Sequence, residues 1–311
     1  MLTKILIKKM FITSSIVIII LLVYFMPGVV EVDNNFKTSV EYVDLTNNIV
    51  YLVDGDGFLV ESTISTIDVE TDEDKIRDLL NHLSDASNEI IPNGLNHVFN
   101  SKISLIGVFV DENIASLNFS NDVLELDNKE LIRFVEAVSY TIINNLDING
   151  VGIYVDNKLI NTYVDIDIPD IITKDFGINK MYHFNKTDDI VKYVVYYTKI
   201  IDGNRYYVPV TKYINSDDDK INIIIKDLSS SYIYQPNLVS IVSEEIELLN
   251  SNINNNEMVL DFSNSIFLDN YDIKEEVVYP FVSTILSNYD VESVVFRANG
   301  EEILKKTKKN G

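Results

Sequence analysis

The sequence predicts an α+β fold in which a unit of the order ββαββαβ occurs twice after one transmembrane helix. Three observations lead to this prediction. An uncharged segment lies near the N-terminus, nearly all of the remaining chain is duplicated, and apolar runs of strand length alternate with runs of helical periodicity inside each copy. We expect each copy to be a small domain with its two helices packed on one face of a sheet.

The first predicted element is the uncharged segment 10–30, which follows three lysines. At about 1.5 Å per residue it can cross a hydrocarbon core of about 30 Å. A cleaved signal peptide is the alternative, but it would have a shorter apolar region and a small-residue cleavage site. The preceding lysines place residues 1–9 in the cytoplasm. We therefore expect a single-pass protein of the cell membrane, with a stalk at 31–46 and the bulk of the chain extracytoplasmic.

The duplication is the strongest signal in the remaining chain. The matched segments are 72–84 with 217–229, 117–121 with 260–264, and 141–147 with 284–290. The offset between the copies drifts only from 145 to 143 residues along this span. Such a period is too long for a solenoid repeat, so each copy should be a domain. We place domain 1 at 47–163 and domain 2 at 191–304.

Each copy opens with a predicted β-hairpin. Apolar runs flank Asp54-Gly55 in the first copy and Asp202-Gly203 in the second. Asp-Gly between such runs favours a hairpin because Gly accepts the positive φ of the turn. The first turn also resembles the start of a calcium loop, but EF-hand spacing places Phe58 and Ser65 where an oxygen ligand and a Glu are needed. The hairpin interpretation is therefore favoured.

A helix with an acidic start follows each hairpin, and its apolar residues recur at i, i+3, i+4 and i+7. They are Ile76, Leu79, Leu80 and Leu83 in the first copy and Ile221, Ile224, Ile225 and Leu228 in the second. His82 lies opposite this apolar face and aligns with Asp227. We expect His82 to be in solvent.

Two strands, a second helix and a last strand complete each copy. In the first copy we expect them at 103–110, 114–119, 128–145 and 151–155, and in the second at 246–253, 258–262, 273–288 and 294–298. Pro280 should either kink the second of these helices or mark a later start. Residues 164–190 lack clean periodicity and are interpreted as a linker or a partly extended connector, and 305–311 as a basic, frayed tail.

The composition excludes several classes of function. The chain has 25 Lys and Arg against 48 Asp and Glu, a formal net charge of -23, and no Cys. Disulfides, cysteine zinc sites and thiol nucleophiles are excluded, and nucleic acid is not an expected partner. His97 and His183 have no counterpart in the other copy and no spacing that suits a metal. We therefore predict no catalytic residues, no metal, no cofactor and no small-molecule substrate.

Tyrosines crowd the second predicted hairpin and form the candidate interaction surface. They are Tyr193, Tyr196, Tyr197, Tyr206, Tyr207 and Tyr213. Tyrosine is enriched in interfaces because it combines a flat apolar ring with a polar tip. Packing within a sheet explains the same alternation and is the favoured interpretation.

The ordered motifs resemble the GerMN domain family of sporulation and spore germination proteins. They are Ile91-Pro92-Asn93-Gly94, the Leu-x-Phe-Ser motif at 117–120, the helix that bears Thr141, and the segment 208–214 in the second copy. The resemblance implies an αββαβ core like that of ring-building modules, plus the N-terminal hairpin, and a non-enzymatic role in an envelope-spanning assembly. It also implies a lipid anchor on a Cys, which this chain lacks, so the segment 10–30 must take that role.

We therefore expect a membrane-anchored, extracytoplasmic scaffold that binds an envelope protein or itself. Two alternatives remain open. One is a cell-envelope protein that binds wall glycans or hydrolyses them with a pair of carboxylates about 5 to 10 Å apart. The other is an exported accessory module of a membrane sensor.

Overall fold

The structure, a computed structural model, describes residues 48–64, 69–87, 90–229, 238–240, 247–263 and 275–308. The predicted membrane segment 10–30 and stalk 31–46 lie outside these residues. None of the helices found in the described ranges has the length and apolar character needed to cross a bilayer.

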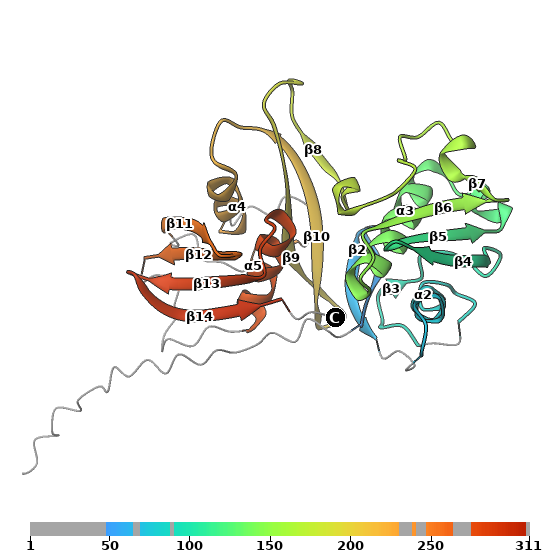
Figure 1. Ribbon diagram of the computed structural model, residues 1–311, viewed down its shortest axis with the longest axis horizontal. Coiled ribbons are helices and arrows are strands. Elements are labelled where there is room, and N and C mark those ends of the chain that lie inside the picture. Colours follow the sequence, from blue (N-terminus) through green and yellow to red (C-terminus); the bar gives the residue numbers. More distant parts are fainter. Residues whose placement is uncertain are drawn as a thin grey trace, which may run out of the picture. The chain divides into compact units, whose positions relative to one another are not determined.

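The predicted order ββαββαβ occurs in both copies, with a short extra strand after the first helix of the first copy and one further strand at the end of each copy (Figure 1). The first copy consists of β1 (Asn48–Asp54), β2 (Leu59–Ile64), α2 (Asp72–Asn81), β3 (Leu95–Asn96), β4 (Leu105–Asp111), β5 (Ile114–Phe119), η1 (Asn121–Glu125), α3 (Asn128–Asn145), β6 (Gly150–Val155) and β7 (Lys158–Leu159). The second consists of β9 (Ile190–Ile201), β10 (Asn204–Asn215), α4 (Lys220–Leu228), β11 (Leu248–Asn254), β12 (Glu257–Phe262), α5 (Glu275–Asn288), β13 (Ser293–Ala298) and β14 (Glu301–Thr307).

Each copy has its own four-stranded sheet. The strand orders are β4-β5-β6-β7 and β11-β12-β13-β14. In both, the first two strands are antiparallel and the middle pair is parallel, because a helix connects the middle strands. The edge strand β4 and its equivalent β11 each carry a register shift near their start.

The hairpins do not belong to these sheets. They join in a third sheet of order β3-β1-β2-β10-β8, with β9 paired to β10. The two copies meet where β2 and β10 pair in antiparallel orientation, with Glu61 opposite Tyr207. Because β2 and β10 are equivalent strands, the run β1-β2-β10-β9 has the same order when it is followed from either end. The two hairpins are therefore related by an approximate two-fold axis.

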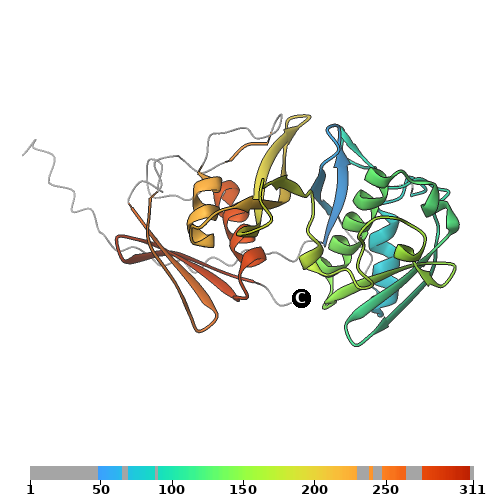
Figure 2. The same cartoon turned by 90° about the horizontal axis from the view of Figure 1, so that it is seen from above.

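Both helices of each copy lie on one face of its four-stranded sheet, as expected, but the expectation of a single sheet is wrong because the hairpin belongs to another one. In each copy the helices lie between the hairpin and the four-stranded sheet (Figures 1 and 2). Helix α3 contacts both β1 and β6, and α5 contacts both β9 and β13. The centre of β9 is buried at every position rather than at alternate ones. Strands with such continuous apolar runs are covered on both faces.

An aromatic cluster lies in the core of each copy. Phe99, Phe119 and Phe134 pack edge to face with centroids 5.0 to 6.4 Å apart. In the second copy Phe281 packs edge to face against Phe262 and Phe296. Edge-to-face packing is the favoured geometry for buried rings because positive ring edges meet negative faces. Aromatic contacts therefore fix the long helix to the sheet in each copy, although the helix residue differs, Phe134 in the first and Phe281 in the second.

Helix ends follow the sequence signals closely. Helix α3 begins after Asp127, whose carboxylate accepts from the Glu130 N–H while the Glu130 side chain accepts from the Asp127 N–H, which is a capping box. Helix α5 begins at Glu275 and contains Pro280, so a helix start after the proline is wrong.

Two segments that were predicted to lie outside the domains are ordered. The linker 164–190 contains the short helix η3 (Lys174–Phe176) and the strand β8 (Met181–His183), which pairs in parallel with β10. The prediction of a frayed tail at 305–311 is wrong up to Thr307, because β14 continues to that residue. Lys306 is buried, and the ammonium of Lys305 pairs with Glu257. Ion pairing and burial of the lysine stems explain why these basic residues enter a strand.

Candidate interaction site

The first copy fixes its hairpin to its long helix through a polar clamp. The N–H of Ile49 donates to Oδ1 of Asn145 at 2.7 Å, and Nδ2 of Asn145 donates back to the Ile49 carbonyl at 2.6 Å. The N–H of Tyr51 donates to Oγ1 of Thr141 at 3.3 Å. The helix thus satisfies backbone groups of β1 that a neighbouring strand would otherwise bind.

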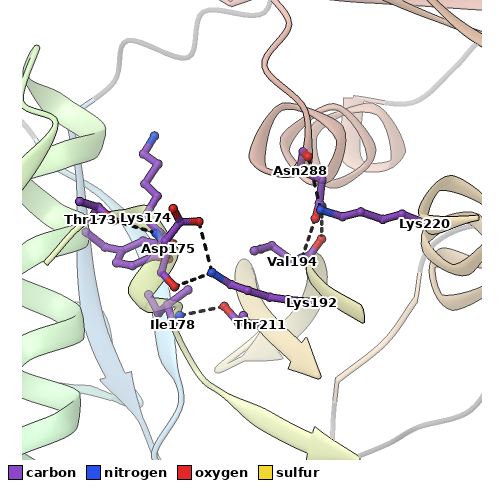
Figure 3. A network of polar contacts seen from close by, with 10 residues as sticks. Thr173, Lys174, Asp175, Ile178, Lys192, Val194, Thr211, Lys220 and Asn288 are labelled. Atoms are coloured by element: carbon purple, nitrogen blue, oxygen red, sulfur yellow. Dashed lines mark hydrogen bonds and ion pairs between the residues drawn. The ribbon is translucent and has the colours of Figure 1, made fainter. Parts of the chain in front are cut away.

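The second copy repeats the clamp, as Figure 3 shows for Asn288 and Val194. Asn288 accepts from the Val194 N–H at 3.0 Å and donates to the Val194 carbonyl at 2.7 Å, and Thr284 accepts from the Tyr196 N–H at 3.0 Å. The Thr-x-x-x-Asn spacing at 141–145 and 284–288 was part of the matched segments, so a sequence signal for the clamp existed.

A buried carboxyl group joins the two copies. Glu61, on β2, is 8% exposed and accepts hydrogen bonds from Tyr51 of its own copy and from Tyr279 of the second copy, each at 2.9 Å. Burial raises the pKa of the Glu61 carboxyl to about 7, and the hydrogen bonds from Tyr279 and Tyr51 oppose this rise. The ring of Tyr279 also packs on Tyr207, with centroids 4.4 Å apart.

An ion pair also crosses the junction. The ammonium of Lys199, which is 4% exposed, binds the carboxylates of Asp54 and Asp56, the latter at 2.6 Å. Asp54 also accepts from the N–H groups of Asp56 and Phe58 at 2.9 and 2.8 Å, which closes the hairpin turn. The hairpin interpretation of this turn is confirmed, and the cation it holds is a lysine of the second copy.

The connector between the copies contributes a third contact. Asn179 donates from Nδ2 to the carbonyls of Leu59 and Pro209, each at 2.8 Å, and so bridges the two hairpins. Its N–H donates to Glu136 on α3 at 2.9 Å. Burial raises the pKa of the Glu136 carboxyl to about 7, although the nearby Lys180 ammonium, at 3.5 Å, opposes the rise.

Further contacts tie the connector to the second hairpin. Lys192 on β9 forms an ion pair with Asp175 at 3.4 Å, and the Ile178 N–H donates to Thr211 on β10 at 2.9 Å (Figure 3). The connector residues therefore pack against both copies.

Three of the predicted interface tyrosines are buried. Tyr193, Tyr196 and Tyr197 are 3%, 8% and 3% exposed. Tyr193 and Tyr197 each donate to Asp227 at 3.0 Å, and Lys212 binds the same carboxylate at 2.6 Å. The prediction that these three tyrosines belong to an exposed interaction surface is wrong, because α4 and α5 cover β9.

The other three tyrosines are half-buried and do not gather on one surface. Tyr206 and Tyr207 are adjacent on β10 and so point to opposite faces. Tyr213 stacks on the exposed Tyr182 with centroids 4.9 Å apart. The six tyrosines thus serve mainly as sheet packing.

The three histidines form no common site. His82 follows the last turn of α2 and is 8% exposed, so the expectation that it lies in solvent is wrong. His82 keeps a helical backbone, with φ of -66° and ψ of -17°, so its burial means that other segments cover this side of the helix end. Nowhere in the described ranges do three His, Asp or Glu side chains gather as metal ligands would.

A hollow of about 320 Å³ lies on the sheet of the first copy. Its lining residues carry no ionisable acid or base that could act in hydrolysis and are Gly107, Val108, Phe109, Ser116, Asn118, Tyr154 and Asn157. The two carboxyl groups with raised pKa, Glu61 and Glu136, lie elsewhere and are buried in structural contacts. The paired carboxylates of the glycan hydrolase alternative are therefore not found in this hollow. Its chemistry suits the binding of apolar side chains.

Comparison with known proteins gives concordant matches. The family model described as "Germane: Sporulation and spore germination" matches residues 49–161 and 194–304. The spore germination protein GerM of Bacillus subtilis (strain 168) is 26% identical over 266 residues, which cover 82% of this chain and 72% of that protein.

Solved structures of the same relative also match. The tandem GerMN domains of the sporulation protein GerM from Bacillus subtilis have a TM-score of 0.74 at 25% identity, with 84% of this chain and 94% of that chain covered. The first GerMN domain alone has a TM-score of 0.38 at 20% identity and covers 41% of this chain and 97% of that chain.

Proposed function

Because this chain belongs to the Germane family of sporulation and spore germination proteins, we propose that it acts as a membrane-anchored, extracytoplasmic interaction protein in a cell-envelope assembly. The role is GerM-like and non-enzymatic. It serves in sporulation or germination by holding two tandem domains in one fixed arrangement toward a protein partner. The similarity to GerM along most of the chain supports the cellular process.

One observation carries the non-enzymatic part of the proposal. The buried ionisable groups of the junction serve to join the copies, as the contacts of Lys199 with Asp54 and of Glu61 with Tyr279 illustrate. Catalytic groups must reach a substrate in a cleft, whereas these side chains are bound to one another and buried. A rigid two-domain body with such a junction suits the presentation of a surface.

The membrane-anchored part rests on the sequence. The uncharged segment 10–30 and the lysines before it support an N-terminus in the cytoplasm and an exported body.

Deletion of the gene in the source organism tests the cellular role. We expect fewer heat-resistant spores or slower germination, and restoration of both by the full chain. A complementing copy that lacks residues 191–304 should fail, because the junction needs both domains. Normal spore yield and normal germination of the deletion strain would contradict the proposal.

A further inference from the structure

The outer faces of the two four-stranded sheets differ although their backbones are equivalent. Residues 107, 109, 116, 118 and 154 correspond to 250, 252, 259, 261 and 297 by the offset of 143 residues. In the second copy these positions hold Asn250, Asn252, Val259, Asp261 and Arg297. A face of small residues bordered by two aromatic rings therefore occurs in the first copy alone.

The hollow in the first copy arises from alternating small and large residues. Gly107 pairs with Asn118, and Phe109 pairs with Ser116 in the next row. Asn118 in turn pairs with Tyr154 on β6. Side chains of residues two apart point to the same face of a sheet, so Phe109 and Tyr154 border a floor of small residues. Phe109 is 62% exposed, so its ring is available to a ligand.

Strand β4 borders this hollow and forms the edge of its sheet. Among the strands of the described part, only β5 pairs with β4. The strand contains no Lys or Pro, the residues that commonly block pairing at an edge. An edge strand offers its outward N–H and C=O groups to an added strand, and pockets beside it select alternate side chains. On β1 and β9, the Asn and Thr side chains of the clamps bind outward backbone groups. In the described part of the chain, β4 has no such clamp.

The charge beside β4 restricts the occupant. Asp111 and Glu112 are exposed at the end of β4, and the exposed Asp147 lies next to them, within 3.5 Å of Asn113. A second copy of this chain would bring the same acidic groups and a net charge of -23. Like charges repel, whereas a basic segment is attracted.

We propose that β4 and the hollow beside it bind an extended segment of a partner protein that carries basic residues next to alternating apolar ones. The segment adds as a strand to β4, a large apolar side chain enters the hollow between Phe109 and Tyr154, and a Lys or Arg meets Asp111 and Glu112. This inference rests on the proposed function, since it names the surface through which the interaction occurs.

A peptide titration tests the proposal on the full-length chain in detergent. The probe is a peptide of alternating Thr and Val with one central Trp and two Lys at each end. The chain contains no Trp, so the peptide fluorescence alone reports binding. Phe109→Ser should weaken binding about tenfold, or by about 1.4 kcal/mol, because a central aromatic anchor carries a large share of the binding energy. Asn252→Ser, at the equivalent position of the second copy, should leave binding unchanged.

Gly107→Val provides a second variant that fills the hollow. A Cβ at Gly107 meets Asn118 at 3.7 Å, an ordinary contact, so the sheet accepts the substitution. We expect at least a tenfold loss of affinity with an unchanged melting temperature. A peptide with Glu in place of Lys should bind about tenfold more weakly at low salt, and the difference should shrink at high salt.

Each other outcome overturns the proposal. Equal affinities for the wild type, Phe109→Ser and Gly107→Val exclude the hollow, and so does a lack of peptide binding up to millimolar concentration. Self-association that depends on Phe109 would identify a second copy as the occupant, and binding of soluble wall oligosaccharides that depends on Phe109 would identify a glycan. If the peptide does not bind as expected while the full chain restores sporulation in the deletion strain, β4 and its hollow are excluded as the binding site and the proposed function stands.

Discussion

Glu61 and Glu136 are buried carboxyl groups on the first copy, and burial raises both pKa values from 4.5 to about 7. The folded protein therefore holds their protons more tightly than the unfolded chain does. Stability from these groups is fully present below about pH 4.5 and is lost as the pH rises through 7. Each group contributes about 3 kcal/mol to this loss.

The free energy of unfolding should accordingly fall between pH 5 and pH 8. Glu61→Gln should remove about half of this fall, because Gln stays neutral while Glu136 still titrates. Glu136→Gln is the matched variant and should remove the other half. Chemical denaturation at several pH values measures the effect, and an identical pH dependence in wild type and Glu61→Gln would contradict it.

The residue contacts were the part of the structure least accessible from the sequence. Alternation along a strand assigned Tyr193 and Tyr197 to one face, but it could not show that a helix covers that face. The burial of His82 was missed because helical periodicity indicates the side of the helix on which a residue lies, but not which other segments cover that side. The pairing of Lys199 with Asp54 joins residues whose proximity depends on how two domains dock, and no local pattern reports that.

At the level of elements, the clamps between hairpin and helix should be equivalent in the two copies. Asn145→Leu leaves the N–H and C=O of Ile49 without their side-chain partners and should lower the free energy of unfolding by about 2 kcal/mol. Asn288→Leu should cause a similar loss for the same reason at Val194. Equilibrium denaturation measures both losses.

The exposed Asn250→Ser serves as the control for these clamp variants and should change stability by less than about 0.5 kcal/mol. Equal stability of Asn145→Leu and the control would show that the clamp does not hold the hairpin.

Most elements were predictable because their signals are local. Helical periodicity gave α3 with both ends correct, and the turn residues gave the strand pairs that flank 111–113 and 254–256. The sheet to which each hairpin belongs was not predictable, because the sequence of a hairpin does not show which other strand will pair with it. The continuous burial of β9, with apolar residues at successive positions, was the available signal that the hairpin is covered on both faces.

For the whole molecule, we expect the two copies to unfold as one unit. Lys199→Met leaves the buried carboxylate of Asp54 without its ammonium, which should cost about 3 to 5 kcal/mol at the junction. Calorimetry should then resolve two transitions in place of one. Adding Asp54→Asn should restore part of the lost stability, since the unpaired charge is removed. A single transition at the wild-type temperature in Lys199→Met would contradict a shared junction.

The direction of the chain across the membrane can be tested by labelling, because the sequence contains no Cys. Ser101→Cys lies on the exposed surface of the first copy and should react with a membrane-impermeant maleimide in intact cells. Thr3→Cys should react only after permeabilisation. Labelling of Thr3→Cys alone in intact cells would reverse the predicted orientation.

The family resemblance predicted from the ordered motifs is confirmed, and so is the tandem arrangement of two α+β domains. That prediction succeeded because duplicated motifs, in the same order, are a property of the whole chain rather than of one site. The partner could not be predicted in this way, since a surface is defined by residues brought together from several strands.

The contact between Asp54 and Lys199 has a consequence for how the two copies can differ. The clamps make Ile49 equivalent to Val194, and Asp54 and Lys199 each follow five residues later on β1 and β9, so they occupy equivalent positions of the two copies. They face each other across the approximate two-fold axis, so two identical units in a homodimer would oppose Asp with Asp or Lys with Lys. Because the two copies differ in sequence, one position can be an acid while its counterpart is a base. The tandem thus specifies a heterologous pairing that a homodimer of identical units could not contain.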